Sequence, residues 1–122
     1  MQPEVETLFD EAGGDLALGD LEAAAAKYAR CVELVPDFFE GWHALGMARM
    51  KLGQLSLAIE AGLRAVELNP KDQLAWSSLS LCYVKNSQIP EAEAAAAKAR
   101  VLGWGEQLKR PNSPSPDAPK NA

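Results

Sequence analysis

Apolar residues recur along most of the chain at intervals of three and four positions, with polar residues between them. From Phe38 to Ala48 such intervals separate Phe38, Trp42, Leu45 and Ala48, and Met50 and Leu52 follow them. A strand would instead alternate apolar and polar residues with a period of two. The pattern therefore predicts helices at about residues 4–18, 20–34, 38–52, 55–68 and 73–86, and a last helix with Pro90 in its first turn.

Capping and turn-forming residues mark the ends of these predicted helices. Asp37 with Glu40 is a plausible capping pair at the start of the third helix, and Asp72 is expected to cap the fifth. Gly53 follows the third helix, as glycine often follows a last helical turn. Pro70 follows the fourth helix, and the residue before a proline disfavours helical geometry. The elements are therefore short helices joined by tight turns.

The chain repeats itself with a period of 34 residues. The first and second units share ten identical positions, and the second and third share eight. Trp42 aligns with Trp76, and Leu45 aligns with Leu79. The units are residues 3–36, 37–70 and 71–104. Each unit contains two predicted helices, and stacking such hairpins on one another buries the apolar faces that a single hairpin leaves exposed.

These repeats resemble the tetratricopeptide repeat (TPR) family, which has the same 34-residue period. The residues of the second unit that carry the resemblance are Trp42, Leu45, Gly46, Ala58, Ala65 and Pro70. The chain departs from the pattern with Leu8 in place of Trp, and with Gly62 and Ala96 in place of Phe. The resemblance implies an all-α fold, a right-handed α-solenoid of three TPR helix hairpins with a short C-terminal helical turn and a flexible tail.

The predicted domain covers residues 3–110. It consists of the three repeats and a partial cap at residues 105–110, because Pro111 stops any helix that continues. Residues 111–122 are rich in Pro, Ser and Asn and are expected to form a disordered tail. With so short a cap, Trp104 and Leu108 are expected to stay partly exposed, and they form the predicted self-association surface.

A curved stack of hairpins has a concave face formed by the first helix of each pair. Residues on this face that the core does not use are expected to form a groove for a partner. These residues are Phe9, Glu40, His43, Met47, Met50, Lys51, Leu74, Ser77, Leu81 and Lys85. Because many of them are apolar, and exposed apolar patches mark interaction sites, the groove is predicted to bind an apolar segment.

TPR co-chaperones hold the C-terminal carboxylate of heat-shock proteins with a clamp of Lys, Asn and Arg residues. The resemblance places the clamp positions on five residues of this chain. They are Phe9, Gly13, Ala44, Leu74 and Ser78. None of these side chains is cationic or an amide, and a buried carboxylate without such a partner is costly. A carboxylate-clamp function is therefore not expected.

Composition narrows the function classes further. The 122 residues carry a net charge of −5, which argues against a protein that binds nucleic acid through a basic face. No apolar run approaches the roughly 18 residues of a membrane span, and the N-terminus lacks the pattern of a signal peptide. These features predict a cytoplasmic protein without a membrane or nucleic-acid partner.

The residues needed for catalysis or metal binding are scarce. His43 is the only histidine, and no cysteine stands near it in the sequence. Cys31 and Cys82 have no metal or redox spacing and are expected to be buried as small apolar residues. We therefore expect no enzyme activity, no metal site and no cofactor.

Two hypotheses remain open at this point. In the first, the chain is a TPR adaptor or scaffold that binds an apolar peptide or helix of another protein in the groove. In the second, it is a structural protein that forms homo-oligomers through its uncapped C-terminal end. The pathway, the partner and the oligomeric state do not follow from the sequence.

Overall fold

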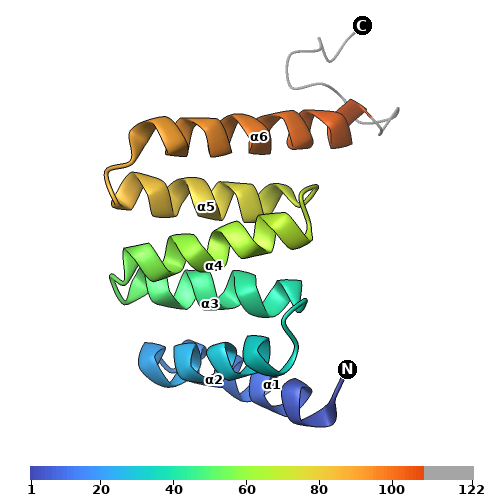
Figure 1. The fold of residues 1–122 in the computed structure, drawn as a ribbon, viewed down its shortest axis with the longest axis vertical. Coiled ribbons are helices and arrows are strands. Elements are labelled where there is room, and N and C mark those ends of the chain that lie inside the picture. The colour runs from blue at the N-terminus through green and yellow to red at the C-terminus, as the bar shows by residue number, and fades with distance from the viewer. Residues whose placement is uncertain (109–122) are drawn as a thin grey trace, which may run out of the picture.

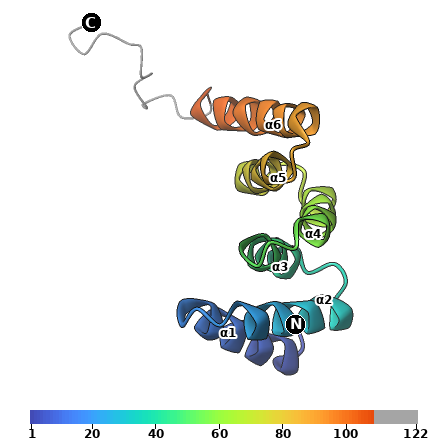
Figure 2. The ribbon, with the colours of Figure 1, turned by 90° about the vertical axis from the view of Figure 1, so that its left-hand side faces the viewer.

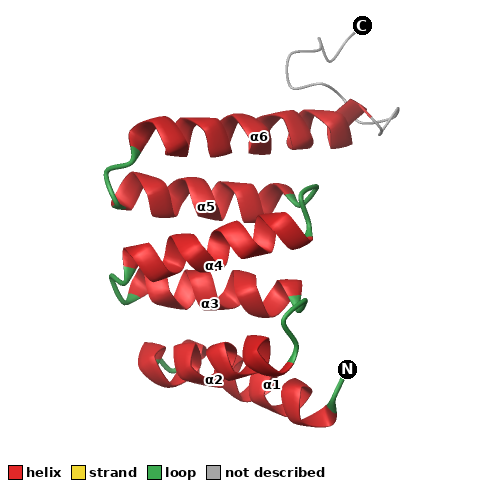
Figure 3. Ribbon diagram, in the orientation of Figure 1, coloured by secondary structure: helices red, strands yellow, loops and turns green. Residues whose placement is uncertain are grey.

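The computed structural model describes residues 1–108, and within them the chain forms six α-helices and no strand. The helices are α1 (Pro3–Ala17), α2 (Leu21–Leu34), α3 (Phe39–Lys51), α4 (Leu55–Leu68), α5 (Gln73–Lys85) and α6 (Ile89–Leu108). Each helix contacts the next along the chain, so that three hairpins stack in one direction (Figure 1). Short loops join all six (Figure 3). The predicted fold class is confirmed.

The two helices of a hairpin lie on different sides of the stack. In Figure 2, α3 and α5 lie on one side and α4 lies on the other. We call the surface formed by α1, α3 and α5 the leading-helix face. It corresponds to the side on which the sequence predicts a partner groove.

The turns within the three hairpins share one backbone geometry. Gly19, Gly53 and Ser87, which align in the repeat, adopt positive φ angles of 82°, 78° and 60°. Glycine occupies this left-handed region at no steric cost, whereas a side chain makes it unfavourable. The prediction that Gly53 ends the third helix is therefore confirmed. Ser87 adopts the same turn geometry at a conformational cost.

Two of the helices begin with an aspartate cap. The Asp20 carboxylate accepts a hydrogen bond from the Ala23 amide at 3.2 Å, and Asp72 accepts one from Ala75 at 3.0 Å. The prediction for Asp72 is confirmed. The prediction that Asp37 caps α3 is wrong, because the N-cap residue is Phe38, which makes no side-chain capping bond.

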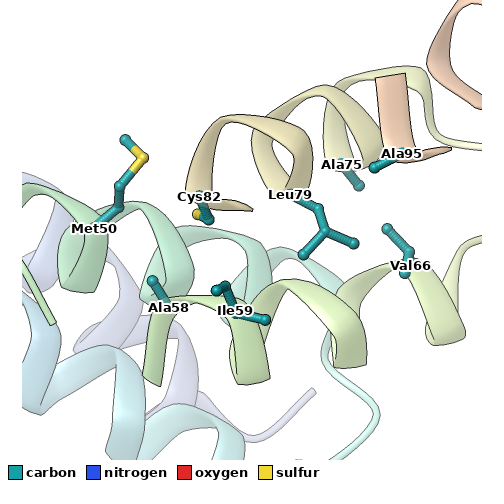
Figure 4. Packing of buried hydrophobic residues seen from close by; sticks show 8 residues of the cluster. All are labelled: Met50, Ala58, Ile59, Val66, Ala75, Leu79, Cys82 and Ala95. Carbon is teal, nitrogen blue, oxygen red and sulfur yellow. The ribbon is translucent and has the colours of Figure 1, made fainter. Parts of the chain in front are cut away.

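The core is divided into layers between successive helices. Leu45 and Leu79, each 1% exposed, are aligned in the repeat and fill equivalent central positions. Figure 4 shows Leu79 of α5 packed over Ile59 and Val66 of α4. Stacking of the hairpins thus buries the same repeat positions in successive layers, as the period predicts.

The last helix differs from the prediction at its C-terminal end. Residues 105–108 are helical, but they continue α6 without a break instead of forming a separate short turn. Residues 109 and 110 of the predicted cap, and the predicted tail 111–122, lie outside the described residues.

On the side of α6 where a following hairpin would stack, polar residues occupy the core positions of the repeat. The core positions of Ile59 and Val66 in α4 correspond to Glu93 and Arg100 in α6, both of which are exposed. Charged residues at stacking positions disfavour another hairpin there, because burying an unpaired charge is costly. The first turns of α6 therefore form a polar cap on the stack.

Candidate functional site

The leading-helix face is most apolar on α5. Leu74 is 63% exposed, Leu81 is 42% exposed and Val84 is 50% exposed. Leu74 and Leu81 lie seven residues apart, so they share one side of the helix. The exposed polar residues Ser77 and Lys85 lie on the same side. These five residues form an apolar row with a polar margin.

The middle of the leading-helix face is held together by a hydrogen bond between α3 and α5. His43 Nε2 lies 3.0 Å from Ser78 Oγ, and the imidazole stacks on the Phe39 ring with a centroid distance of 6.2 Å. Burial lowers the pKa of His43 below its ordinary value of 6.5, while the charge of Asp72 partly opposes this shift. A neutral His43 therefore joins two hairpins.

Charged residues border the face. Lys51 and Lys85 are the last residues of α3 and α5 and are both exposed. Because the two helices occupy equivalent places in successive repeats, their lysines stand at the same edge. Glu40, in the first turn of α3, is exposed at the opposite end of that helix. The face thus has a basic edge beside its apolar row.

One predicted groove residue, Phe9, is partly buried and packs against the core. Its ring centroid lies 5.4 Å from that of Tyr28 and 5.1 Å from that of Phe38. Part of the Phe9 ring therefore packs between two aromatic neighbours, while its role in the groove stays a prediction.

The two predicted groove methionines differ in how far they are buried. Met50 is 8% exposed and belongs to the core cluster between α3, α4 and α5, so the prediction that it lines the groove is wrong. Met47 is partly buried and packs against the same cluster. The apolar part of the face is consequently contributed by α5 and not by the centre of the stack.

A second apolar surface lies on α6. Val101 is 65% exposed, Trp104 is 69% exposed and Leu108 is 80% exposed. A cleft of about 690 Å³ runs beside them and is also lined by Gln73 of α5. The predicted exposure of Trp104 and Leu108 is therefore confirmed.

The described residues offer little for a metal or a reactive thiol. Within 1–108, no three side chains of the types His, Cys, Asp and Glu come together as a metal site. Cys31 and Cys82 are free and buried, and burial raises the pKa of both thiols. A raised pKa disfavours the reactive thiolate. None of the helices in this part of the chain is long and apolar enough to cross a bilayer.

Comparison with known proteins agrees with this architecture. The family model of the tetratricopeptide repeat matches residues 39–72. No curated protein matches the chain. Among solved structures, the CopN-Scc3 complex aligns with a TM-score of 0.83 and 23% identity over 88% of this chain and 64% of that chain. The MamA crystal structure aligns with a TM-score of 0.79 and 20% identity, over 84% and 60% of the two chains.

A yeast protein has a similar fold at lower sequence identity. The TPR2B domain of yeast Sti1, solved in complex with pHsp70, aligns with a TM-score of 0.82 and 17% identity over 89% of this chain and 87% of that chain. This chain spans less than two thirds of the CopN-Scc3 and MamA chains it matches. Fold and repeat together define an α-solenoid of helix hairpins. Residues 39–72 match the tetratricopeptide repeat model, and the described helices share the fold of solved structures such as the TPR2B domain.

Proposed function

We propose that the chain is a non-enzymatic protein–protein interaction module whose leading-helix face binds an apolar segment of another protein. The observation that carries the proposal is the exposed apolar row of Leu74, Leu81 and Val84 on α5. Contiguous exposed apolar patches are unusual on monomeric proteins and mark places where a partner binds. The role is that of an adaptor or scaffold.

Similar structures support the proposal that the chain binds another protein. The CopN-Scc3 structure and the Sti1 TPR2B structure are both complexes with another protein. They share the fold of this chain at 23% and 17% identity. The fold is therefore one that presents a binding surface, and the residues on that surface decide the partner.

The residue types on the face favour an apolar partner over a terminal carboxylate. The positions that the family's carboxylate clamp would use include Ala44, Leu74 and Ser78, none of which provides a cation or an amide. A carboxylate bound there would lose its hydration without gaining a charged partner. Lys51 and Lys85 lie at the edge of the face instead. We infer that the ligand is an apolar segment, helical or extended, with an acidic group next to its apolar part.

The pair of His43 and Ser78 is better explained by packing than by catalysis. Such a pair is a minimal requirement for a serine nucleophile, which also needs hydrogen-bond donors for the developing oxyanion. Ser78 lies in the middle of α5, where the backbone amides are used within the helix. The hydrogen bond therefore serves to fix α5 against α3. The two free, buried cysteines fit a reducing compartment such as the cytoplasm.

Affinity capture with a matched pair of double variants tests the proposal. Leu74→Glu with Leu81→Glu places two charges in the apolar row, while Leu57→Glu with Leu63→Glu places two charges on α4, where these leucines are 43% and 45% exposed. A partner that binds wild type and the α4 variant but not the α5 variant supports the leading-helix face. A partner that binds both variants equally contradicts it. Phe9 is unsuitable for such a test because its substitution would disturb the core.

The captured partner then identifies the ligand. A peptide containing its apolar segment should bind wild type and lose at least about tenfold in affinity for the α5 variant, which corresponds to about 1.4 kcal/mol. Circular dichroism of both variants checks that the helices are intact. Lys51→Ala with Lys85→Ala should weaken binding and reduce its salt dependence if the segment carries an acidic group at the basic edge.

A further inference from the structure

The outward side of α6 carries a regular apolar stripe. Its members follow one another at alternating spacings of three and four residues, the spacing of a helix–helix seam. They are Ala94, Ala97, Val101, Trp104 and Leu108. The residues that α6 buries against α5 are Ala92, Ala95 and Ala99. At 100° per residue the stripe lies on the opposite side of the helix from these alanines. We call it the outer stripe of α6.

The outer stripe departs from the repeat where it becomes apolar. Val101 occupies the position of Glu33 in α2 and Glu67 in α4. Each of those glutamates is exposed and forms an ion pair with an arginine three residues earlier, at 3.1 Å and 3.0 Å. In α6 a valine that is 65% exposed stands at this position, and Trp104 and Leu108 extend the stripe beyond it. Intrachain packing does not account for these apolar residues, because none of them is buried.

The position of α6 leaves room for a second helix along the stripe. Figures 1 and 2 both show α6 at the end of the stack, with no described element on its far side. A cleft of about 690 Å³ lies beside the stripe, between Ala97 and Trp104 along α6 and against Gln73 of α5. A helix approaching α6 from outside would meet both the stripe and the cleft.

The side chains of the stripe are complementary to a second copy of the same stripe. Its first half is small (Ala94, Ala97) and its second half is large (Trp104, Leu108). Parallel pairing would place large residues against large ones and leave a gap between the alanines. Antiparallel pairing places Leu108 of each copy beside Ala97 of the other, and Trp104 beside Val101. Small and large residues then interdigitate, as they do in well-packed cores.

The charged residues next to the stripe permit this arrangement. Arg100 and Gln107 lie on one flank of the stripe, and Lys98 lies on the other. In the antiparallel register Arg100 falls beside the partner's Gln107, whose amide oxygen can accept a hydrogen bond. Lys98 falls beside the partner's Gly105, and its ammonium group is directed toward the Trp76 ring, 5.9 Å from the centroid. The register therefore places no like charges side by side.

We propose that the chain forms a closed homodimer in which the outer stripe of α6 packs antiparallel on the outer stripe of a second copy. The same surface is used by both copies, so the interface is isologous and does not extend into a filament. The stripe from Ala94 to Leu108 is about 22 Å long. Such a helix pair buries less than the roughly 800 Å² per partner of a standard interface. We expect a micromolar dimer that leaves the leading-helix face free.

Sedimentation equilibrium of the full chain over a range of concentrations tests the dimer. Wild type should show a reversible monomer–dimer equilibrium, and Trp104→Glu should weaken it at least tenfold. Leu63→Glu, which alters an exposed leucine on α4, should dimerise as wild type does. Leu74→Glu with Leu81→Glu should also dimerise normally, which separates this proposal from partner binding by the leading-helix face. A monomeric wild type, or an unaffected Trp104→Glu variant, would overturn the proposal.

Engineered thiols test the antiparallel register. The native cysteines are buried, so they do not compete in oxidation at the surface. The double variant Ala97→Cys with Leu108→Cys should form a covalent dimer under mild oxidation, because the two positions lie side by side across the interface. Ala97→Cys alone should not cross-link. Efficient cross-linking by the single variant would show a parallel register, and failure of the double variant to cross-link would also contradict the antiparallel arrangement.

Discussion

Trp42 and Trp76 make the same hydrogen bond one repeat apart. Each indole N–H donates to the carbonyl oxygen of the proline six residues earlier, Pro36 or Pro70, at 2.8 Å. Both tryptophans are partly buried and pack against neighbouring core clusters. They therefore join the loop between two hairpins to the first turns of the following helix. The two tryptophans lie at the edge of the core, while Leu45 and Leu79 fill its centre.

The first prediction concerns this indole hydrogen bond. Trp76→Phe keeps an aromatic ring against the core but leaves the Pro70 carbonyl without its donor. We expect a loss of about 1 kcal/mol in the free energy of unfolding, the usual net value of one hydrogen bond. Urea unfolding measures it. The control is Trp104→Phe, because Trp104 is 69% exposed and its replacement should change stability by less than about 0.5 kcal/mol. Equal effects of the two substitutions would contradict the role of the Pro70 contact.

The second prediction concerns two helical glycines with different surroundings. A Cβ atom at Gly62 of α4 would lie 3.1 Å from Leu79 Cδ1, and Leu79 is only 1% exposed. A Cβ at Gly14 of α1 would meet nothing within 4 Å. We expect Gly14→Ala to raise the free energy of unfolding by about 1 kcal/mol through helix propensity. In Gly62→Ala, crowding against Leu79 should cancel this gain or reverse it.

Thermal and urea unfolding of the two alanine variants provide the comparison. The expected result is a clearly more stable Gly14→Ala variant and a neutral or destabilised Gly62→Ala variant. Equal stabilisation by both would show that Leu79 can move aside. The close contact also explains why glycine replaces the aromatic residue of the family pattern at position 62, since Leu79 already fills the space there.

The helices follow directly from the sequence because their period and their turn residues agree. The glycines at 19 and 53 recur with the repeat, so the helix ends were predictable to within about two residues. The wrong prediction of a cap at Asp37 could have been avoided by comparing the repeats. Asp72 aligns with Phe38 and not with Asp37, so the repeat register already indicates Phe38 as the N-cap residue of α3.

The site was less predictable because burial depends on position in the stack. Met50 and Val84 occupy the same place in successive repeats, yet Met50 is 8% exposed and Val84 is 50% exposed. The following hairpin covers α3, whereas no described hairpin follows α5 and α6. A prediction that treats each helix separately does not show which residues the next hairpin covers. Phe9 shows a second limit, since its position next to Tyr28 and Phe38 depends on packing between helices.

The third prediction concerns the pH dependence of His43. Burial lowers the pKa of the folded-state imidazole below its ordinary value of 6.5. The unfolded chain therefore binds a proton at higher pH than the folded chain does. The contribution of His43 to stability is complete above pH 6.5 and is lost as the pH falls toward the folded-state pKa. Acidification over this interval should destabilise the protein.

Replacement of His43 isolates this effect from other titrations. His43→Gln keeps a group that can hydrogen-bond Ser78 but does not titrate, so the decline in stability just below pH 6.5 should become smaller. Urea unfolding at a series of pH values measures the slopes, and NMR titration of the histidine measures its pKa directly. A pKa above 6.5, or identical slopes in the two proteins, would contradict the burial of a neutral ring between α3 and α5.

The fourth prediction uses the turn between α5 and α6. Ser87 has a φ of 60°, whereas the aligned residues of the other hairpins are Gly19 and Gly53. A non-glycine residue in the left-handed region costs about 1–2 kcal/mol, and part of this is offset because glycine makes the unfolded chain more flexible. We therefore expect Ser87→Gly to raise the free energy of unfolding by up to about 1 kcal/mol, and Gly53→Ala to lower it by a similar amount. Urea unfolding of both variants, with wild type as reference, measures the two shifts. A destabilised Ser87→Gly protein would mean that the serine side chain contributes more to the turn than its backbone geometry costs.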